Sequence, residues 1–270
     1  MKIVVGQGSC GIAAGAGRVY DALAQALSGT AHELTIAGCI GMCYLEPIVD
    51  IYEESGALTR LVRVQEKDVP TIAKAVETGD QSALAALMIT DDDKAFLDQQ
   101  TRIALRHCGV INPEKIEDYL ADGYSSIRKA LASMAPEDVI ETIKVSGLKG
   151  RGGAGFPTWF KWNAARKEQA QPKYLICNAD EGDPGAFMDR AVIEGDPHNL
   201  IEGMLIAAYA IGASEMVVYV RAEYPLAVKR LRNAIRQAEE QGFLGDNILG
   251  SGFSCRMRIK EGAGAFVCGE

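Results

Sequence analysis

The chain has 270 residues, with 28 Lys and Arg against 36 Asp and Glu, a formal net charge of −8, and 48% hydrophobic residues. This length predicts about two domains with a core that needs no disulfides. The acidic balance excludes general nucleic-acid binding, which requires a basic surface. The apolar run at 3–5 is too short for a signal peptide. The most apolar stretch, 200–220, contains Glu202 and Glu215, so it predicts a buried helix and a strand rather than a membrane span. We therefore expect a cytoplasmic protein.

The first 82 residues predict a small α+β domain of thioredoxin-like size. Short apolar runs indicate strands, and Pro70 at a first-turn position indicates the start of a helix. In chain order, we expect a strand at 2–5, a helix at 17–27, strands at 34–37, 47–52 and 61–64, and a helix at 69–78.

Residues 83–110 are predicted to be a linker that includes a polar connecting helix over 94–107, and 111–270 a second domain. Its strands and helices alternate, which favours an open parallel α/β sheet. We expect short helices at 113–120, 125–131 and 136–145, strands at 174–177, 215–220 and 256–260, and helices from Pro197 to Gly212 and from Pro225 to Gly242.

The densest motif is the glycine loop, residues 147–157. Gly150, Gly152 and Gly155 satisfy G-x-G-x-x-G, but a helix rather than a strand precedes them, so the dinucleotide-binding context is absent. Glycines still let backbone N–H groups approach a phosphate closely. Between Lys144 and Lys173 there are seven basic residues and one acidic residue. This favours a phosphate site, and the alternative is a glycine-rich surface turn among solvated charges.

The acidic loop, residues 177–185, follows a predicted strand at the edge where open α/β sheets bind ligands. Asn178 offers donors and an acceptor, whereas ionised Asp180 and Glu181 only accept hydrogen bonds. These groups suit the hydroxyls of a nucleotide or of flavin mononucleotide. Two alternatives are a site for a hard ion such as Mg²⁺ and an Asx-rich turn that ends the strand.

Three of the seven cysteines lie in the first domain. Their clustering favours metal or redox chemistry in a reducing compartment. Cys39 and Cys43 are separated by three residues, so the pair does not form the C-x-x-C of dithiol exchange. With Cys10 they make a candidate metal set.

Three long motifs in one order carry a family resemblance: 150–158 with Lys161 and Trp162, then 178–187, then 261–270. Together they resemble the NADH-binding flavoprotein subunit of respiratory complex I. They look most like its soluble relatives, the diaphorase-type subunits of electron-bifurcating hydrogenases and NAD-dependent formate dehydrogenases. The resemblance covers roughly 104–270, and 1–82 resembles the thioredoxin-like [2Fe–2S] domain often fused in front. It implies a thioredoxin-like α+β domain followed by a Rossmann-like FMN-binding α/β domain.

The resemblance also implies an oxidoreductase that binds FMN non-covalently and reacts with NAD(H). The glycine loop with Arg151 and Lys161 would hold the phosphate and ring region, and the acidic loop the ribityl chain and ring. Phe156 would pack on the NADH adenine. The residues implied for FMN are Gly150, Arg151, Gly152, Gly153, Lys161, Asn178, Asp180, Glu181, Gly182, Phe266, Gly269 and Glu270. The residues implied for NADH are Phe156, Asp183 and Glu270.

The resemblance implies iron–sulfur clusters as well. The family continues beyond the position of residue 270 into a segment with four cysteines for a [4Fe–4S] cluster. Thioredoxin-like [2Fe–2S] domains use four thiolates, but here only Cys10, Cys39 and Cys43 match the pattern. Either a [2Fe–2S] cluster has an unusual fourth ligand, for which Ser9 is a candidate, or the domain has lost its cluster and kept its fold for docking.

Two positions depart from the family. Ala164 stands where many relatives carry Phe as half of an adenine clamp, and Phe266 stands where complex I subunits often have Tyr.

We expect hydride transfer between NAD(H) and FMN and single-electron transfer onward, within a soluble multi-subunit oxidoreductase. The implied partners are a small thioredoxin-like [2Fe–2S] subunit and a larger iron–sulfur or catalytic subunit. The alternative is a flavin-binding or degenerate docking subunit that no longer reacts with NADH.

Overall fold

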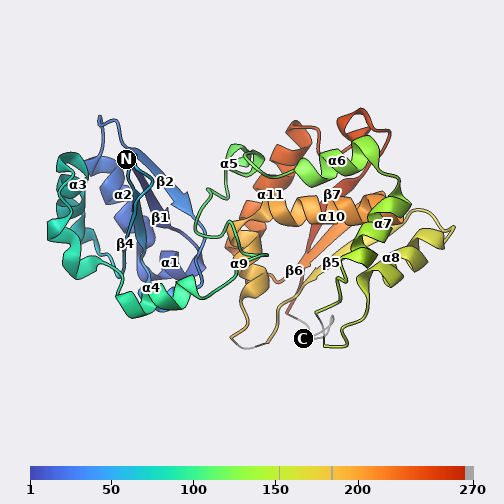
Figure 1. Cartoon of the computed structure of the whole chain (residues 1–270), viewed down its shortest axis with the longest axis horizontal. Helices are drawn as coiled ribbons and strands as arrows, with labels where there is room; N and C mark the ends of the chain where they lie inside the picture. Colours follow the sequence, from blue (N-terminus) through green and yellow to red (C-terminus); the bar gives the residue numbers. More distant parts are fainter. Residues whose placement is uncertain (152, 184, 265–270) are drawn as a thin grey trace. The chain divides into compact units, whose positions relative to one another are not determined.

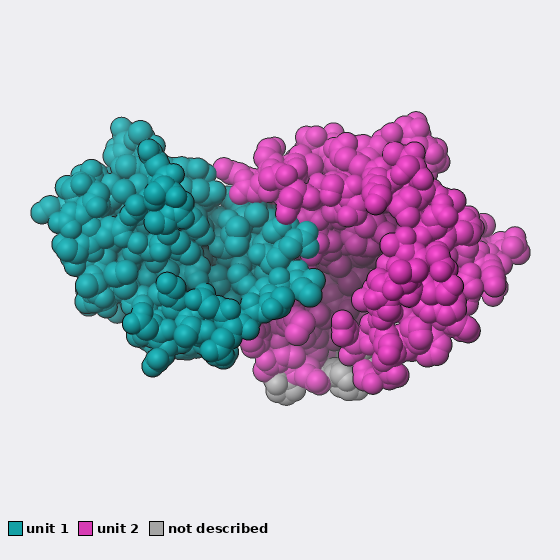
Figure 2. Space-filling view, viewed as in Figure 1, with its two compact units in different colours: residues 1–113, 194–196 teal, residues 114–193, 197–270 magenta. Residues whose placement is uncertain are grey.

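The structure, a computed structural model, describes residues 1–151, 153–183 and 185–264. The chain forms two compact units, coloured separately in Figure 2. Unit 1 consists of 1–113 with the short segment 194–196, and unit 2 of 114–193 with 197–270. The predicted linker, 83–110, lies within unit 1.

Unit 1 is built on a four-stranded mixed sheet with strand order β2-β1-β3-β4 (Figure 1). Strand β1 is parallel to β2 and antiparallel to β3, and β3 is antiparallel to β4. This is the thioredoxin-like arrangement expected from the sequence. The strands are β1 (Lys2–Gly6), β2 (Glu33–Ala37), β3 (Val49–Tyr52) and β4 (Leu58–Leu61).

Two amphipathic helices, α2 (Ala16–Ala26) and α3 (Val69–Thr78), bury apolar side chains in the core of this unit. Helix α3 has Pro70 in its first turn and ends at Gly79, whose φ of 74° is in the left-handed region. Shorter elements connect the rest: α1 (Ser9–Ala14), η1 (Cys43–Leu45), η2 (Glu66–Asp68), η3 (Ser82–Leu87) and α4 (Asp91–Asp98).

Two predicted elements of unit 1 were wrong in their limits. The fourth strand covers 58–61 rather than 61–64, because Arg63 takes a φ of 52° that no strand accommodates. The connecting helix covers 91–98 rather than 94–107. Thr90 accepts a hydrogen bond from the backbone N–H of Asp93, so the acidic run forms the first turn of the helix.

Unit 2 is built on a three-stranded sheet with the order β5-β6-β7, in which both strand pairs are parallel. This confirms the predicted open parallel sheet. The strands are β5 (Tyr174–Ala179), β6 (Glu215–Val220) and β7 (Arg256–Glu261). The helices of this unit are α5 (Ile116–Leu120), α6 (Ser125–Ser133), α7 (Pro136–Val145), α8 (Thr158–Lys167), α9 (Met188–Gly195), α10 (Pro197–Ile211) and α11 (Pro225–Glu240), with a 3₁₀ turn η4 (Ile248–Gly250).

Helix α10 is the most deeply buried helix of unit 2, and one charged side chain on it is buried as well. Glu202 is 7% exposed and accepts hydrogen bonds from the Tyr119 hydroxyl at 2.6 Å and from the backbone N–H of Tyr124 at 2.8 Å. The N–H groups of Ser126 and Ile127 donate to its other oxygen at 3.0 and 3.1 Å. This carboxylate therefore accepts hydrogen bonds from backbone N–H groups at the N-terminus of α6, which have no acceptor within the helix.

Within the described residues, no helix combines the length and the apolar character that crossing a membrane requires.

Candidate functional site

The glycine loop is closed by backbone hydrogen bonds at its base. The N–H of Gly150 donates to the carbonyl of Phe156 at 2.8 Å, and the N–H of Thr158 donates to the carbonyl of Leu148 at 3.1 Å. Gly153 and Gly155 have φ values of 90° and 58°, and a Cβ at either position would meet no atom within 4 Å. Glycine is needed here for backbone conformation rather than for space. The space beside the backbone at Gly153 and Gly155 is therefore open.

Helix α8 begins directly after this loop and carries the second predicted cation. Arg151 and Lys161 are both exposed, and the Lys161 Nζ lies 5.6 Å from the centre of the Phe156 ring. Phe156 is 43% exposed and packs edge-to-face on Phe160. The loop and the first turns of α8 thus present two cations beside an exposed aromatic ring, a combination that suits a phosphate attached to a flat ring system.

The two tryptophans of α8 have a structural role. Trp159 and Trp162 pack against a buried cluster that contains Ala130, Val139 and Ile140. They leave Lys161, which lies between them in sequence, on the exposed side of the helix.

The acidic loop surrounds a cavity of about 200 Å³ at the end of β5. Four of its lining residues carry carboxylates. Burial, together with the negative charge of nearby Glu181, raises the pKa of one of them, the Asp189 carboxyl. The structure thereby brings together the predicted residues of this loop and adds Ala186 and Asp189. The lining residues are Asn178, Asp180, Glu181, Gly182, Asp183, Ala186 and Asp189.

Glu181 is fixed by its neighbours rather than aimed freely into the cavity. Its Oε1 accepts from the N–H of Asp189 at 3.1 Å, and its Oε2 accepts from the N–H of Arg190 at 3.2 Å and from the Tyr224 hydroxyl at 3.2 Å. The Arg221 guanidinium also donates to the Glu181 carbonyl. Glu181 therefore caps α9 and fastens the loop to the segment after β6.

Arg221 and Tyr224 were not predicted from the sequence, and no motif marks them.

Figure 1 shows the glycine loop and the acidic loop along the same edge of unit 2 in this view, beyond the carboxyl end of β5. That edge is where parallel α/β sheets bind ligands. The predicted residues Gly152, Phe266, Gly269 and Glu270 lie outside the described residues.

The three predicted metal ligands of unit 1 come together in space. The Sγ atoms of Cys10, Cys39 and Cys43 all lie within 4.8 Å of one another. Ser9, the candidate fourth ligand, instead donates from its hydroxyl and its N–H to Glu194. Glu46 lies beside Cys10, and burial is the main factor that raises the pKa of its carboxyl to about 8. Glu46 was not predicted from the sequence, although it follows Cys43 by three residues.

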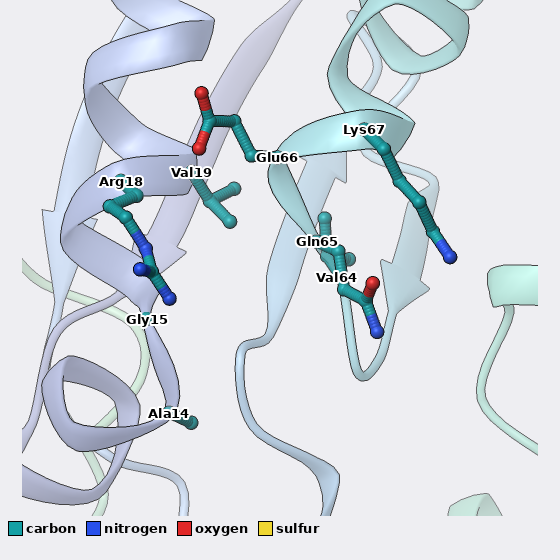
Figure 3. Close-up of a pocket in the computed structure, with 8 residues that line it drawn as sticks. All are labelled: Ala14, Gly15, Arg18, Val19, Val64, Gln65, Glu66 and Lys67. Carbon is teal, nitrogen blue, oxygen red and sulfur yellow. The ribbon is translucent and has the colours of Figure 1, made fainter.

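Unit 1 also contains a surface cavity of about 390 Å³ between the start of α2 and η2 (Figure 3). Arg18 on one wall and Glu66 with Lys67 on the other provide mixed charge. None of the residues predicted for a site lines it.

Comparison with known proteins agrees with the resemblance for the part of the chain that contains both loops. Residues 143–270 match the family model of the Nuo51 FMN-binding domain. This segment therefore belongs to the flavoprotein family that the three motifs indicated.

Several individual proteins are similar to this chain. The chain is 59% identical over 173 residues to NADP-reducing hydrogenase subunit HndC of Solidesulfovibrio fructosivorans, a match of 64% of this chain and 35% of the relative. It is 50% identical over 169 residues to an NADH-quinone oxidoreductase subunit of Rhizobium meliloti, a match of 62% of this chain and 40% of the relative. A solved NAD⁺-reducing [NiFe]-hydrogenase in the H₂-reduced state aligns with all of this chain and 44% of its own, at 26% identity and a TM-score of 0.49. The matches thus span less than half of each of these proteins.

Proposed function

We propose that the chain carries the FMN- and NAD(H)-binding part of an oxidoreductase subunit, which exchanges a hydride with NAD(H) and passes single electrons on to iron–sulfur clusters. The observation that carries this proposal is the family match over 143–270, because that segment contains the open glycine loop and the acidic cavity. We further propose a cytoplasmic multi-subunit assembly, with a small thioredoxin-like [2Fe–2S] subunit and a larger iron–sulfur or catalytic subunit as partners.

The glycine loop would bind the phosphate of FMN. Its backbone N–H groups approach an anion without obstruction, because Gly153 and Gly155 bring no side chain. Arg151 and Lys161 would add positive charge, and the proximity of Lys161 to the Phe156 ring keeps that cation beside an aromatic surface.

The acidic loop would bind the ribityl hydroxyls and one edge of the flavin ring. Asn178 and Asp180 line the cavity with acceptors for hydroxyl groups. Glu181 contributes by holding the loop in shape through α9 and Tyr224. Asp183, also on the cavity wall, is exposed toward solvent and would face the nicotinamide nucleotide.

Bound FMN supplies the hydride and single-electron chemistry, and the protein supplies position and electrostatics. Holding nicotinamide against the ring converts a bimolecular reaction into an oriented one, and no side-chain acid or base is required for hydride transfer. Phe156 would provide one wall for the adenine.

Substitution of the helix cation tests the phosphate site. Lys161→Ala removes one charge-assisted contact of about 1.5–3 kcal/mol, so we expect FMN to bind at least about tenfold more weakly, with a matching loss of NADH oxidation by ferricyanide. Lys167→Ala is the matched control, since Lys167 is an exposed lysine on the same helix. Equal FMN affinity in the two variants would contradict this assignment of Lys161.

Ala164 supports a second candidate function. Because this position lacks the aromatic half of an adenine clamp, the subunit would bind FMN and not react with NADH. That alternative predicts a bound flavin whose absorbance NADH does not change.

A further inference from the structure

A cluster of three potential metal ligands lies in unit 1, with a buried carboxylate beside one of them. Cys10 lies on α1, Cys39 follows β2 and Cys43 begins η1. The Sγ atoms of Cys39 and Cys43 are 3.8 Å apart, and the three Sγ atoms lie within 4.8 Å of one another. Cys39 is 5% exposed, and the N–H of Gly41 donates to its sulfur at 3.2 Å. The thiols of three separate segments therefore point to one place.

Glu46 brings a carboxylate oxygen beside one of these three thiols. Its carboxylate is 7% exposed, and its Oε1 lies 3.8 Å from the Cys10 Sγ. The other oxygen, Oε2, accepts a hydrogen bond from the N–H of Ile48 at 2.8 Å, which fixes the orientation of the group. One oxygen is thus anchored by the backbone, while the other lies beside the Cys10 thiol.

Glycines make room for this arrangement. A Cβ at Gly8 would lie 2.8 Å from the Cβ of Cys39, and a Cβ at Gly6 would lie 3.1 Å from Glu46 Oε2. A Cβ at Gly11 would approach the same oxygen to 3.0 Å. Three glycines around one buried thiol and one buried carboxylate indicate a site built for these groups.

The donor set supplies only three of the four thiolates that thioredoxin-like [2Fe–2S] domains divide between two irons. Among the described cysteines, only three belong to this set, and their sulfurs converge on one point. A single tetrahedral zinc ion, with Zn–S bonds of about 2.3 Å, places its thiolates about 3.8 Å apart and also accepts a carboxylate oxygen. The separation of Cys39 and Cys43 matches that spacing, as it would for two thiolates on one iron, and the third thiol within 4.8 Å of both is the feature that favours a single ion.

We propose that Cys10, Cys39, Cys43 and the Glu46 carboxylate bind one zinc ion, which cross-links helix α1 to the β2–β3 connection of unit 1. With four protein ligands the site is closed, as in structural zinc sites, and Zn²⁺ is not redox-active. This unit would then carry no electrons. Binding releases the thiol protons and adds the metal-binding free energy to the stability of the unit.

Metal analysis of the purified full-length protein tests this proposal independently of the flavin. We expect one zinc per chain, lost in Cys39→Ala and in Glu46→Ala and retained in Cys108→Ala, a buried cysteine of the same unit outside the set. Flavin content and its bleaching by NADH should stay unchanged in all three variants, which separates this outcome from the proposed function.

A second measurement covers variants that fail to fold. Zinc is removed from the unmodified protein with a chelator and replaced by Co²⁺, whose visible absorption should be that of a tetrahedral thiolate site. Iron and acid-labile sulfide that disappear in Cys39→Ala would overturn the proposal in favour of a [2Fe–2S] cluster. A Cys39–Cys43 disulfide in a metal-free folded chain would overturn it too, and full zinc retention in Glu46→Ala would overturn the role of Glu46.

Discussion

Glu181 offers the sharpest test of how the acidic loop is held. Glu181→Ala removes an acceptor from two N–H groups at the start of α9 and from the Tyr224 hydroxyl. Loss of a helix cap costs about 0.5–2 kcal/mol, and loss of a hydrogen bond to a charged group costs about 1.5–3 kcal/mol. We therefore expect the loop and α9 to lose about 2–4 kcal/mol of local stability. Since about 1.4 kcal/mol is a factor of ten in affinity, FMN binding should weaken about 30-fold or more.

Two milder variants separate holding the loop from contact with the flavin. Tyr224→Phe leaves the carboxylate in place and removes one of its three hydrogen bonds, so FMN affinity should fall by about tenfold, less than in Glu181→Ala. Glu181→Gln keeps one acceptor oxygen and should give an intermediate loss. FMN affinity is measured by fluorescence titration of the apoprotein, and loop opening by hydrogen exchange at the N–H groups of Asp189 and Arg190. Glu181→Ala with unchanged exchange but lost FMN would refute this reasoning and assign Glu181 to direct contact.

Three further predictions concern unit 2. Glu202→Ala leaves three backbone N–H groups and a phenol without their acceptor, so unfolding in urea should show a loss of about 3–6 kcal/mol; a loss below about 1 kcal/mol would contradict the capping role. Burial lowers the pKa of His198 to about 4, against the opposing effect of its hydrogen bond with Gln237. The contribution of neutral His198 to the free energy of unfolding is therefore fully present above the unfolded pKa of about 6.5 and is lost as pH falls through about 4. This is a change of about 3 kcal/mol, and His198→Asn should abolish it. Gly153→Ala forces a side chain into a φ of 90°; we expect about 1–2 kcal/mol of local strain and weaker FMN binding, measured by the same titration, whereas Ala154→Gly should have little effect.

The sequence predicts most of the secondary structure where apolar periodicity and end signals coincide. Helix α3, with Pro70 and Gly79 at its ends, is an example. Helix α8 was missed because its apolar residues form no regular stripe: both tryptophans pack inward while Phe160 is 51% exposed. Helix α9 was missed because it begins inside a stretch with the composition of an acidic turn and depends on Glu181 for its cap.

The two site loops could be predicted because glycine density and charge are local properties of the sequence. Tyr224 and Arg221 could not, because their contacts with the acidic loop form only when β6 pairs with β5. The same is true of Glu46. Its nearness to Cys43 is visible in the sequence, but its burial against the glycines of β1 and α1 is a property of the fold.

Hydride transfer between NAD(H) and FMN is the activity that we propose for this chain. An anaerobic titration of the purified full-length protein with NADH, followed by visible absorption, tests it most directly. We predict a flavin spectrum that bleaches on addition of NADH and recovers when an electron acceptor is added. A bound flavin that NADH leaves unchanged, or a folded chain that binds no FMN, would contradict the account.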